Sequence, residues 1–224
     1  MSESIFKENL FEGKKVFITG GATGMGLGFA KAFLEHGADV LIASRKKENL
    51  SKAASEIKEQ TGKALHWKMM DVRKNETVEE VAKHIKDKWG YLDVLVNNAA
   101  GNFVTPAAAM SENAWRAVID IVLDGTFRVS KACYPLLRNN EEGSSIVNII
   151  ANYAWGAAPF VAHSGAAKAG VLNLTRSLAL EWSDDNIRVN AMCPGVVLTD
   201  NVKKNLMLDE SVVKSFESNI PAGI

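Results

Sequence analysis

The chain has 224 residues, of which 47% are hydrophobic and 23% charged, a composition typical of a folded globular protein and unlike that of a disordered one. Its 26 basic and 26 acidic side chains cancel, which argues against a nucleic-acid binder that works by neutralising phosphates, although a local basic pocket stays compatible with zero net charge. Cys133 and Cys193 belong to no CxxC motif and have no histidine pair nearby. We therefore predict neither a disulfide framework nor a metal site, and a reducing cytoplasm is the expected location.

The uncharged parts of the sequence do not have the pattern of a targeting or membrane segment. Residues 1–9 contain three charged side chains and lack the apolar core of a signal peptide. The stretches 94–111 and 143–167 are long and uncharged, but both contain asparagine and proline. Hydrocarbon would leave such polar groups unpaired, so we expect buried strands and site walls there, and no membrane association.

Short apolar runs alternate with helical patterns and predict an α/β fold. The predicted strands are Val16–Thr19, Val40–Ser44, Ala64–Met70, Val94–Asn97, Ser145–Ile150 and Arg188–Met192. The predicted helices are Gly24–His36, Glu48–Thr61, Val78–Trp89, Ala114–Arg138 and Phe160–Ser183. Runs such as VLV at 94–96 barely alternate, as expected for parallel strands buried on both faces. We predict one domain over residues 1–224, a Rossmann-type doubly wound parallel sheet with helices on both faces, whose functional groups lie at the carboxyl ends of the strands.

The strongest local signal is a glycine-rich turn, GGATGMG at residues 20–26, between the first predicted strand and the first predicted helix. Glycines let backbone N–H groups approach a phosphate closely, and the helix N-terminus adds partial positive charge. A glycine turn without a ligand is the structural alternative, whereas the other phosphate-binding loop lacks support because no GKS or GKT follows. The position after the first strand favours a dinucleotide. The predicted contacts are Gly20, Gly21, Thr23, Gly24 and Met25.

The end of the second predicted strand bears on the type of dinucleotide. An aspartate or glutamate there would hold the ribose 2′-hydroxyl of NADH, but this chain has Ser44 and Arg45 followed by two lysines. The planar guanidinium of Arg45 is suited to a 2′-phosphate, and Ser44 adds a hydroxyl donor. A solvated start of a helix is the alternative interpretation of this charge run. Absence of the acid together with presence of Arg45 predicts NADPH as the cofactor.

Four motifs in the right order give the chain a resemblance to a known family over essentially its whole length. They are TGGATGMG at 19–26, Asp71 within MMDV, NNAAG at 97–101 and CPGVV at 193–197. Taken alone, Asp71 would be a strand-end cap and NNAAG a simple turn. Together the motifs resemble the short-chain dehydrogenase/reductase family.

The resemblance implies a set of cofactor contacts beyond the glycine turn. Asp71 and Val72 would lie at the adenine, and Asn98 and Ala99 would support the cofactor after the fourth strand. The residues implied at the nicotinamide are Pro194, Gly195, Val197 and Thr199.

The active-site signature departs from the common pattern of that family. Most members carry tyrosine four residues before the catalytic lysine, but here Ser164 stands at that distance from Lys168 in HSGAAKAG. Residues four apart share a helix face, so both side chains should point into the same space. The nearest preceding tyrosine, Tyr153, follows the fifth predicted strand, and Asn102 follows the fourth in NNAAGNF.

This displaced tyrosine resembles the arrangement in 2,4-dienoyl-CoA reductases of the short-chain type, as do the segments NNAAGNF, AWRAVIDIVLDGTF, NYAWG and HSGAAKAGV. The resemblance implies that Asn102 and Tyr153 hydrogen-bond a thioester carbonyl. It also implies that Ser164 assists them and that Lys168 holds the nicotinamide ribose. The implied reaction is NADPH-dependent reduction of a 2,4-dienoyl-CoA thioester to a 3-enoyl-CoA, an auxiliary step of fatty-acid β-oxidation, in a homotetramer. Asp124 departs from the asparagine common at its position, and if buried it would alter helix geometry and local charge.

The chemistry of a conjugated thioester suits these residue types. Hydride addition to its far end pushes electrons onto the carbonyl oxygen, where the phenol of Tyr153 and the amide of Asn102 supply neutral donors. No alkoxide forms, so loss of tyrosine from the usual place is tolerable for C=C reduction and harmful for ketone reduction.

Each of these residues also has a structural alternative. Tyr153 could pack beside Trp155, Asn102 could cap its loop, and Ser164 could bond its own backbone at the start of a helix. We interpret the neighbouring His163 as a partly exposed loop histidine.

Three other functions stay open at this point: a trans-2-enoyl-CoA reductase of the same family, a dehydrogenase acting on a carbonyl or hydroxyl substrate, and a non-catalytic NADP(H)-binding sensor.

Near the end of the sequence we predict an amphipathic helix, Glu210–Ser218. Resembling proteins continue with a further helix and a seventh strand, so a sheet lacking that C-terminal strand is expected here.

Overall fold

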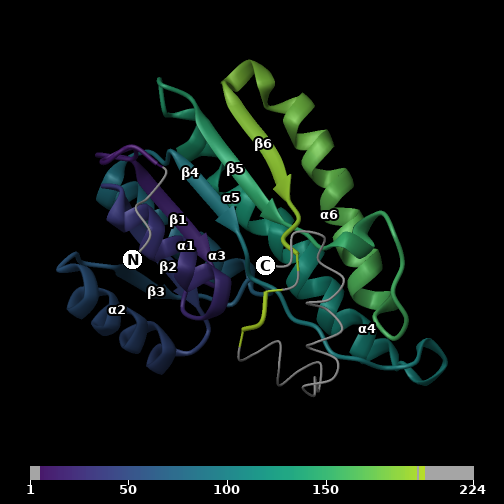
Figure 1. Cartoon of the computed structure of the whole chain (residues 1–224). Helices are drawn as coiled ribbons and strands as arrows, with labels where there is room; N and C mark the ends of the chain where they lie inside the picture. Colours follow the sequence, from purple (N-terminus) through teal and green to yellow (C-terminus); the bar gives the residue numbers. More distant parts are fainter. Residues whose placement is uncertain (1–5, 196, 200–224) are drawn as a thin grey trace.

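In the described part of the chain, six parallel strands form the centre of the fold in the order β3-β2-β1-β4-β5-β6 (Figure 1). They are β1 (Lys15–Thr19), β2 (Asp39–Ser44), β3 (His66–Met69), β4 (Val94–Asn97), β5 (Ser144–Ile149) and β6 (Ile187–Met192). The order reverses at β1, which pairs with β2 on one side and with β4 on the other. This computed structural model describes residues 6–195 and 197–199, and it confirms the predicted Rossmann-type parallel sheet.

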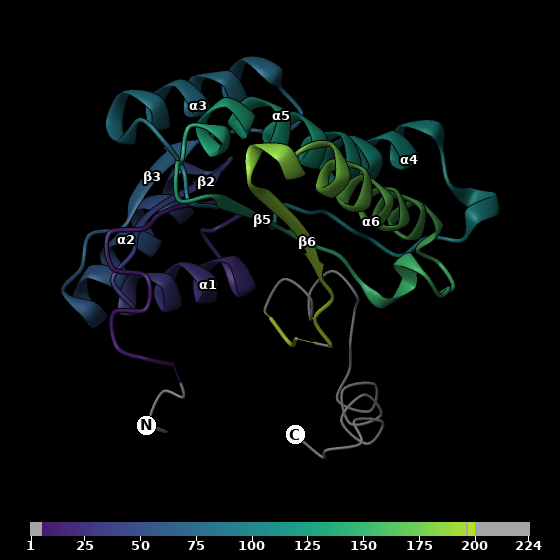
Figure 2. The same ribbon diagram turned by 90° about the horizontal axis from the view of Figure 1, so that it is seen from above.

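The helices cover both faces of this sheet, as predicted. They are α1 (Gly24–Glu35), α2 (Lys47–Thr61), α3 (Asn75–Trp89), α4 (Glu112–Ile119), α5 (Gly125–Arg138) and α6 (Ala162–Glu181). Figure 2 shows α1 and α2 on one face, and α3, α5 and α6 on the other. Within the described ranges, no helix has the length and apolar character needed to cross a membrane.

The inner strands β1, β2, β4 and β5 are largely buried on both faces, which explains why their sequences barely alternate, whereas the edge strand β6 alternates buried and exposed residues and β3 at the other edge is partly exposed. In β1, Val16 and Ile18 pack into a core cluster with residues of α1 and α2. Phe17 between them faces the opposite cluster, which contains residues of α3 and α5. A third cluster joins α4 and α6 around Val118 and Val171. These three clusters pack the helices against the sheet and against one another. The loops of the candidate site follow the carboxyl ends of the strands.

The predicted helix Ala114–Arg138 is wrong in one respect, because it is interrupted by a π-helical turn at Asp120–Asp124. The turn lies where Gly125 packs tightly, since a Cβ there would be 2.8 Å from Cγ2 of Val72. The guanidinium of Arg128 donates a hydrogen bond to the carbonyl of Asp120, the first residue of the π turn, at 3.3 Å. Such π turns often accompany functional sites. The predicted helix Glu210–Ser218 lies outside the described residues.

Candidate active site

The glycine turn after β1 brings backbone atoms into contact distances that side chains would prevent. Gly20 has a φ of +65°, and a Cβ on it would lie 3.0 Å from the Cα of Ala99. A Cβ on Gly26 would lie 2.3 Å from the carbonyl oxygen of Gly20. Thr23 is the N-cap of α1 and Met25 lies in its first turn, which contains no acidic side chain. The positive end of the helix dipole is therefore not neutralised locally, as an anion-binding turn requires.

A threonine that our sequence reasoning missed holds this turn against the loop after β4. The hydroxyl of Thr19 accepts hydrogen bonds from the backbone N–H groups of Asn98 and Ala99, both at 3.0 Å. The side-chain amide of Asn98 donates back to the carbonyls of Thr19 and Gly20, both at 3.1 Å. Asn98 and Ala99 thus brace the glycine turn. Thr19 is the last residue of β1, and that position was the available signal.

Substituting Gly26 tests this close packing. We expect Gly26→Ala to lower the free energy of unfolding by about 1–3 kcal/mol, because the added Cβ would lie 2.3 Å from the carbonyl oxygen of Gly20 and 2.6 Å from the side-chain nitrogen of Asn98, two atoms that are hydrogen-bonded to each other. Gly28→Ala is the matched control, since Gly28 lies two residues further along α1 and a Cβ on it would have nothing within 4 Å. The control should leave stability equal or raise it by about 0.5–1 kcal/mol. Chemical denaturation of both variants measures the difference, and equal stabilities would contradict the account.

At the end of β2, Arg45 is exposed, and no hydrogen bond or salt bridge engages it within residues 6–195 and 197–199. Ser44 is half-buried beside it and fixes the neighbouring strand end, because its carbonyl accepts from the N–H of Met70 at 2.9 Å. Arg45 is close enough to Asp71 to help lower the pKa of that carboxyl group. The guanidinium is thus presented at the carboxyl edge of the sheet.

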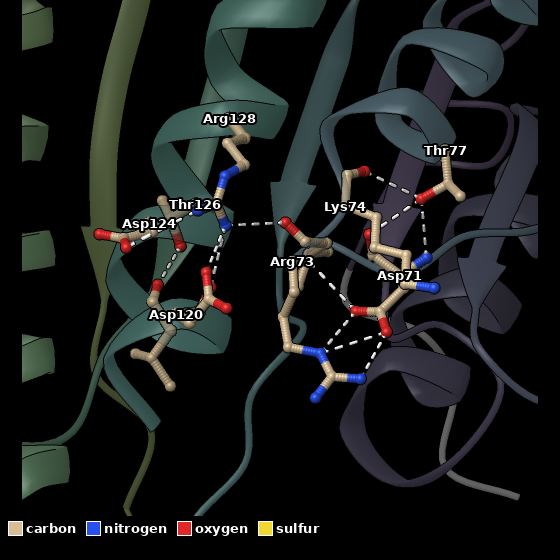
Figure 3. Close-up of polar contacts among 10 residues, drawn as sticks. Asp71, Arg73, Lys74, Thr77, Asp120, Asp124, Thr126 and Arg128 are labelled. Carbon is tan, nitrogen blue, oxygen red and sulfur yellow. Dashed lines mark hydrogen bonds and ion pairs between the residues drawn. The ribbon is translucent and has the colours of Figure 1, made fainter. Parts of the chain in front are cut away.

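The carboxylate of Asp71 is held by Arg73 (Figure 3). Arg73 donates from Nε to Oδ1 at 2.9 Å and from a terminal nitrogen to Oδ2 at 2.6 Å. Hydrogen bonding to Arg73 is the main cause that lowers the pKa of Asp71 below its ordinary value. Thr77 completes the turn by donating to the backbone carbonyl of Asp71 at 2.9 Å. Asp71 therefore stays ionised and fixed in place at this corner.

A second arginine, Arg128, connects the segment after β3 with the π turn (Figure 3). Arg128 donates to the carbonyl of Val72 at 3.3 Å and to the carboxylate of Asp120 at 2.7 Å. Val72 itself is buried. Asp124 is 44% exposed and lies 3.7 Å from Arg128, so its departure from asparagine creates no buried, unpaired charge.

The three candidate catalytic residues from β5 and α6 converge at one place. Tyr153 lies in a short 3₁₀ turn, Asn152–Ala154, after β5, and its hydroxyl is 3.3 Å from Oγ of Ser164. Ser164 and Lys168 both lie on the buried face of α6, as their spacing predicts. The ammonium of Lys168 donates to the carbonyl of Ile149 at 2.5 Å. Burial lowers the pKa of Lys168 to about 8, and Cys193 nearby opposes that shift.

Asn102 lies half-buried in the loop after β4, and its Oδ1 accepts from the N–H of the next residue, Phe103, at 2.9 Å. This is the loop-capping contact that the sequence left open as an alternative. No hydrogen bond joins Asn102 to Tyr153 in the part of the chain that is described. The side-chain N–H groups of Asn102 make no hydrogen bond within the described residues and can donate to a ligand.

The loop after β6 returns to the glycine turn. The N–H of Thr199 donates to the carbonyl of Val197 at 2.9 Å. A Cβ on Gly24 would lie 3.2 Å from Cγ2 of Thr199, so the two loops are in contact. This loop begins at Cys193, directly after β6, and continues with Pro194 and Gly195. The loops after β1 and β6 thus lie side by side at the carboxyl edge of the sheet.

A sequence profile described as short chain dehydrogenase matches residues 14–208. The chain belongs to the short-chain dehydrogenase family. It is therefore an oxidoreductase of a family that binds nicotinamide cofactors, which agrees with the glycine turn and the strand-end loops described above.

Two relatives with informative names match most of this short-chain dehydrogenase. The chain is 41% identical over 95% of its length to a probable 2,4-dienoyl-CoA reductase [(2E)-enoyl-CoA-producing] of Bacillus subtilis, 84% of which is covered. It is 40% identical over 86% of its length to the peroxisomal 2,4-dienoyl-CoA reductase [(3E)-enoyl-CoA-producing] of Rattus norvegicus. The match spans 66% of the rat protein, slightly under two thirds of its length.

Solved structures agree with this assignment. A short chain dehydrogenase from Bacillus anthracis is 42% identical, with a TM-score of 0.81 over 94% of this chain and 82% of that chain. A second short chain dehydrogenase, from Shigella flexneri and complexed with NADP, is 25% identical, with a TM-score of 0.85 over 91% of this chain and 86% of that chain.

Behind the site, this short-chain dehydrogenase contains a chain of buried polar side chains that our sequence reasoning missed. Asn97 of β4 donates its amide to Ser130 of α5 and to Asn148 of β5, both at 2.9 Å. Asn148 donates in turn to Thr175 of α6 at 2.9 Å. These bonds tie two strands to two helices. The asparagines within otherwise apolar strands were the signal, because such buried amides require partners.

The interpretation of His163 as a partly exposed loop residue is wrong. It is the second residue of α6, and its side chain is fully buried on the same helix face as Ser164. The position lies inside the predicted helix Phe160–Ser183, and the first turn of α6 packs against the core, where the imidazole meets the ring of Phe103.

Proposed function

We propose that this short-chain dehydrogenase reduces 2,4-dienoyl-CoA thioesters with NADPH. The observation that carries the proposal is the pairing of Tyr153 with Ser164, one turn from the buried Lys168. Serine stands where most of the family has tyrosine, and the phenol reaches the same place from the loop after β5. The names of the relatives from Bacillus subtilis and rat support the same substrate class.

The side chains fit the electron flow of this reaction. When bound, a nicotinamide would supply hydride. Its addition at the δ-carbon of the dienoyl group would move electrons through both double bonds to the thioester oxygen. The phenol of Tyr153 and the amide of Asn102 are the donors we assign to that oxygen. Neutral donors aimed at a developing oxyanion stabilise it strongly in a site shielded from water. Ser164 holds the phenol by its hydroxyl, at 3.3 Å.

The position of the final proton decides the product. A proton delivered to the α-carbon of the dienolate leaves the remaining double bond between the β- and γ-carbons, which gives a 3-enoyl-CoA. A proton delivered to the γ-carbon gives a 2-enoyl-CoA instead. The rat relative is named for the first product and the Bacillus subtilis relative for the second. We propose the 3-enoyl product for this chain.

The preference for NADPH rests on the end of β2. The exposed Arg45 lies beside Ser44, and no acidic residue occupies the positions directly after that strand. A carboxylate there would repel a 2′-phosphate, whereas the guanidinium offers two parallel donors. Cofactor contacts assigned to Asp71, Val72, Asn98, Ala99 and the loop after β6 belong to the same proposal.

Lys168 gives the proposal a dependence on pH. Its pKa is about 8, so the side chain carries a charge at neutral pH and loses it as the pH rises through that value. If the ammonium holds the cofactor ribose, the protonated form binds more tightly, and affinity for NADPH falls above pH 8 by at most about tenfold per pH unit. Lys168→Arg should remove this fall because arginine stays charged. Calorimetric titration across this range measures both, and a flat profile for the unaltered chain would contradict the assignment.

The reaction itself is tested by following NADPH oxidation with three thioesters: 2,4-hexadienoyl-CoA, crotonyl-CoA and acetoacetyl-CoA. Turnover of the dienoyl substrate in clear preference to the others is the expected result. Turnover of crotonyl-CoA alone would assign a trans-2-enoyl-CoA reductase, and of acetoacetyl-CoA alone a carbonyl reductase. NADPH binding without turnover of any of them would contradict the proposed reaction and leave a dehydrogenase for another carbonyl or hydroxyl substrate, or a sensor.

The setting of the reaction is part of the same proposal. We assign the enzyme to fatty-acid β-oxidation as a homotetramer in the cytoplasm. Light scattering of the intact protein tests the tetramer, and a monomer would contradict it.

A further inference from the structure

His163 lies next to Ser164 and is one of the largest side chains that are fully buried in the described part of the chain. It shares the inner face of α6 with Ser164 and Lys168. None of the steps proposed above uses it. A buried imidazole beside a candidate catalytic hydroxyl needs an explanation, because a hydrophobic side chain would fill the space without burying polar atoms.

The first contact of His163 caps the helix that carries the site. The first N–H groups of an α-helix have no partner within the helix, and the N-cap residue of α6, Val161, has no side-chain acceptor to offer. Nδ1 of His163 accepts the N–H of Ser164 at 2.8 Å. This bond fixes the backbone of Ser164 in the first turn, and with it the direction of the hydroxyl toward Tyr153.

The second contact reaches the loop after β4. The rings of His163 and Phe103 meet edge to face, with centroids 4.5 Å apart and planes at 88°. The N–H of Phe103 donates to Oδ1 of Asn102. One buried ring therefore touches both segments that supply the donors assigned to the thioester oxygen.

The protonation of His163 follows from these contacts. An Nδ1 that accepts a hydrogen bond carries no proton, so the neutral ring has its hydrogen on Nε2. Nε2 is buried and has no hydrogen-bond partner among the residues that the structure describes. A buried donor without a partner lowers stability. Burial of Nε2 therefore lowers the stability of the fold, whereas the hydrogen bond at Nδ1 orders the backbone of Ser164. A side chain that lowers stability while it orders a site is typical of a functional residue.

We propose that His163 is a positioning residue for the reductase reaction, acting through the hydroxyl of Ser164 and the Asn102 loop. This inference rests on the proposed function. His163 touches neither substrate nor cofactor in this role. It sets the orientation of donors whose displacement by about 1 Å would reduce turnover by about 100-fold.

Two substitutions separate the two contacts. His163→Phe keeps an aromatic ring against Phe103 and removes the acceptor for the Ser164 N–H. His163→Asn keeps an acceptor near the place of Nδ1 and removes the ring. Val171→Ala is the structural control, because Val171 is buried on the same face of α6 and belongs to the hydrophobic cluster around Val118.

The first measurement is the steady-state rate with 2,4-hexadienoyl-CoA. His163→Phe should lower kcat by about tenfold at an unchanged affinity for NADPH, and His163→Asn should restore part of it. If His163 acts through the Ser164 hydroxyl, adding His163→Phe to Ser164→Ala should cost less than about twofold more. Full additivity of the two losses, or an equal loss in Val171→Ala, would overturn the proposal.

The second measurement is independent of turnover. Hydrogen exchange of the Ser164 amide, followed by NMR on protein labelled with ¹⁵N-serine, should be at least about tenfold faster in His163→Phe than in the unaltered chain. His163→Asn should protect the amide again. Unchanged exchange in His163→Phe would overturn the cap even in an active enzyme. Faster exchange in a chain that does not reduce dienoyl-CoA would uphold the cap and reject the proposed function instead.

Discussion

Replacing Tyr153 by phenylalanine is expected to lower kcat for 2,4-hexadienoyl-CoA by about 100- to 1000-fold. The substitution removes one hydroxyl group and keeps the ring, so the packing of the 3₁₀ turn after β5 is preserved. The lost group is the one that lies 3.3 Å from Ser164 and that we assign to the thioester oxygen. Stabilisation of that oxygen exists only once negative charge develops, so the loss should fall on kcat, with little change in substrate affinity.

The control for this prediction is Trp155→Phe, a neighbouring aromatic that is 64% exposed. It tests the alternative that Tyr153 serves only to pack beside Trp155. Affinity for NADPH should be the same in both variants and in the unaltered chain. Retention of more than about half of kcat in Tyr153→Phe would mean that the phenol does not act in catalysis.

Replacing Arg45 by alanine is expected to raise the Kd for NADPH by about 10- to 100-fold, the scale of one or two charged hydrogen bonds. The Kd for NADH should change little, because NADH has no 2′-phosphate. The side chain is exposed and engaged by no salt bridge among the described residues, so its removal should not disturb the fold. Fluorescence titration with each cofactor gives the two constants.

Lys47→Ala is the matched control for Arg45, because Lys47 belongs to the same charge run and is exposed at the first position of α2. A general attraction of the anionic cofactor would make the two variants equally weak, and added salt would weaken the unaltered chain to the same extent. A direct contact with the phosphate affects Arg45→Ala alone. Unchanged NADPH affinity in Arg45→Ala would contradict the cofactor assignment.

The sheet was predictable because its central strands are predominantly apolar on both faces. Val16 and Phe17 point to opposite sides of β1 and are both buried, which only a sheet covered by helices on each face allows. The interruption between α4 and α5 was not predictable from periodicity. It coincides with the close approach of Gly125 to Val72, residues that are distant in sequence.

The site was predictable where it depends on local spacing. Ser164 and Lys168 share a helix face because they are four residues apart, and the structure confirms this. The meeting of Tyr153 with Ser164 depends on the path of the loop after β5, for which resemblance was the only guide. His163 escaped because a histidine beside a serine gives no sign of its burial. Its role became visible only through its contacts with Phe103 and the Ser164 N–H.

The most direct test of the central claim is the fate of hydride in a single reaction. NADPH carrying deuterium at its transferable position is incubated with the enzyme and 2,4-hexadienoyl-CoA, and the label is located in the product by NMR. We predict deuterium on the δ-carbon of a 3-enoyl-CoA, because hydride enters at the far end of the conjugated system. Deuterium on the β-carbon, or a dienoyl substrate that remains unreduced, would contradict the account.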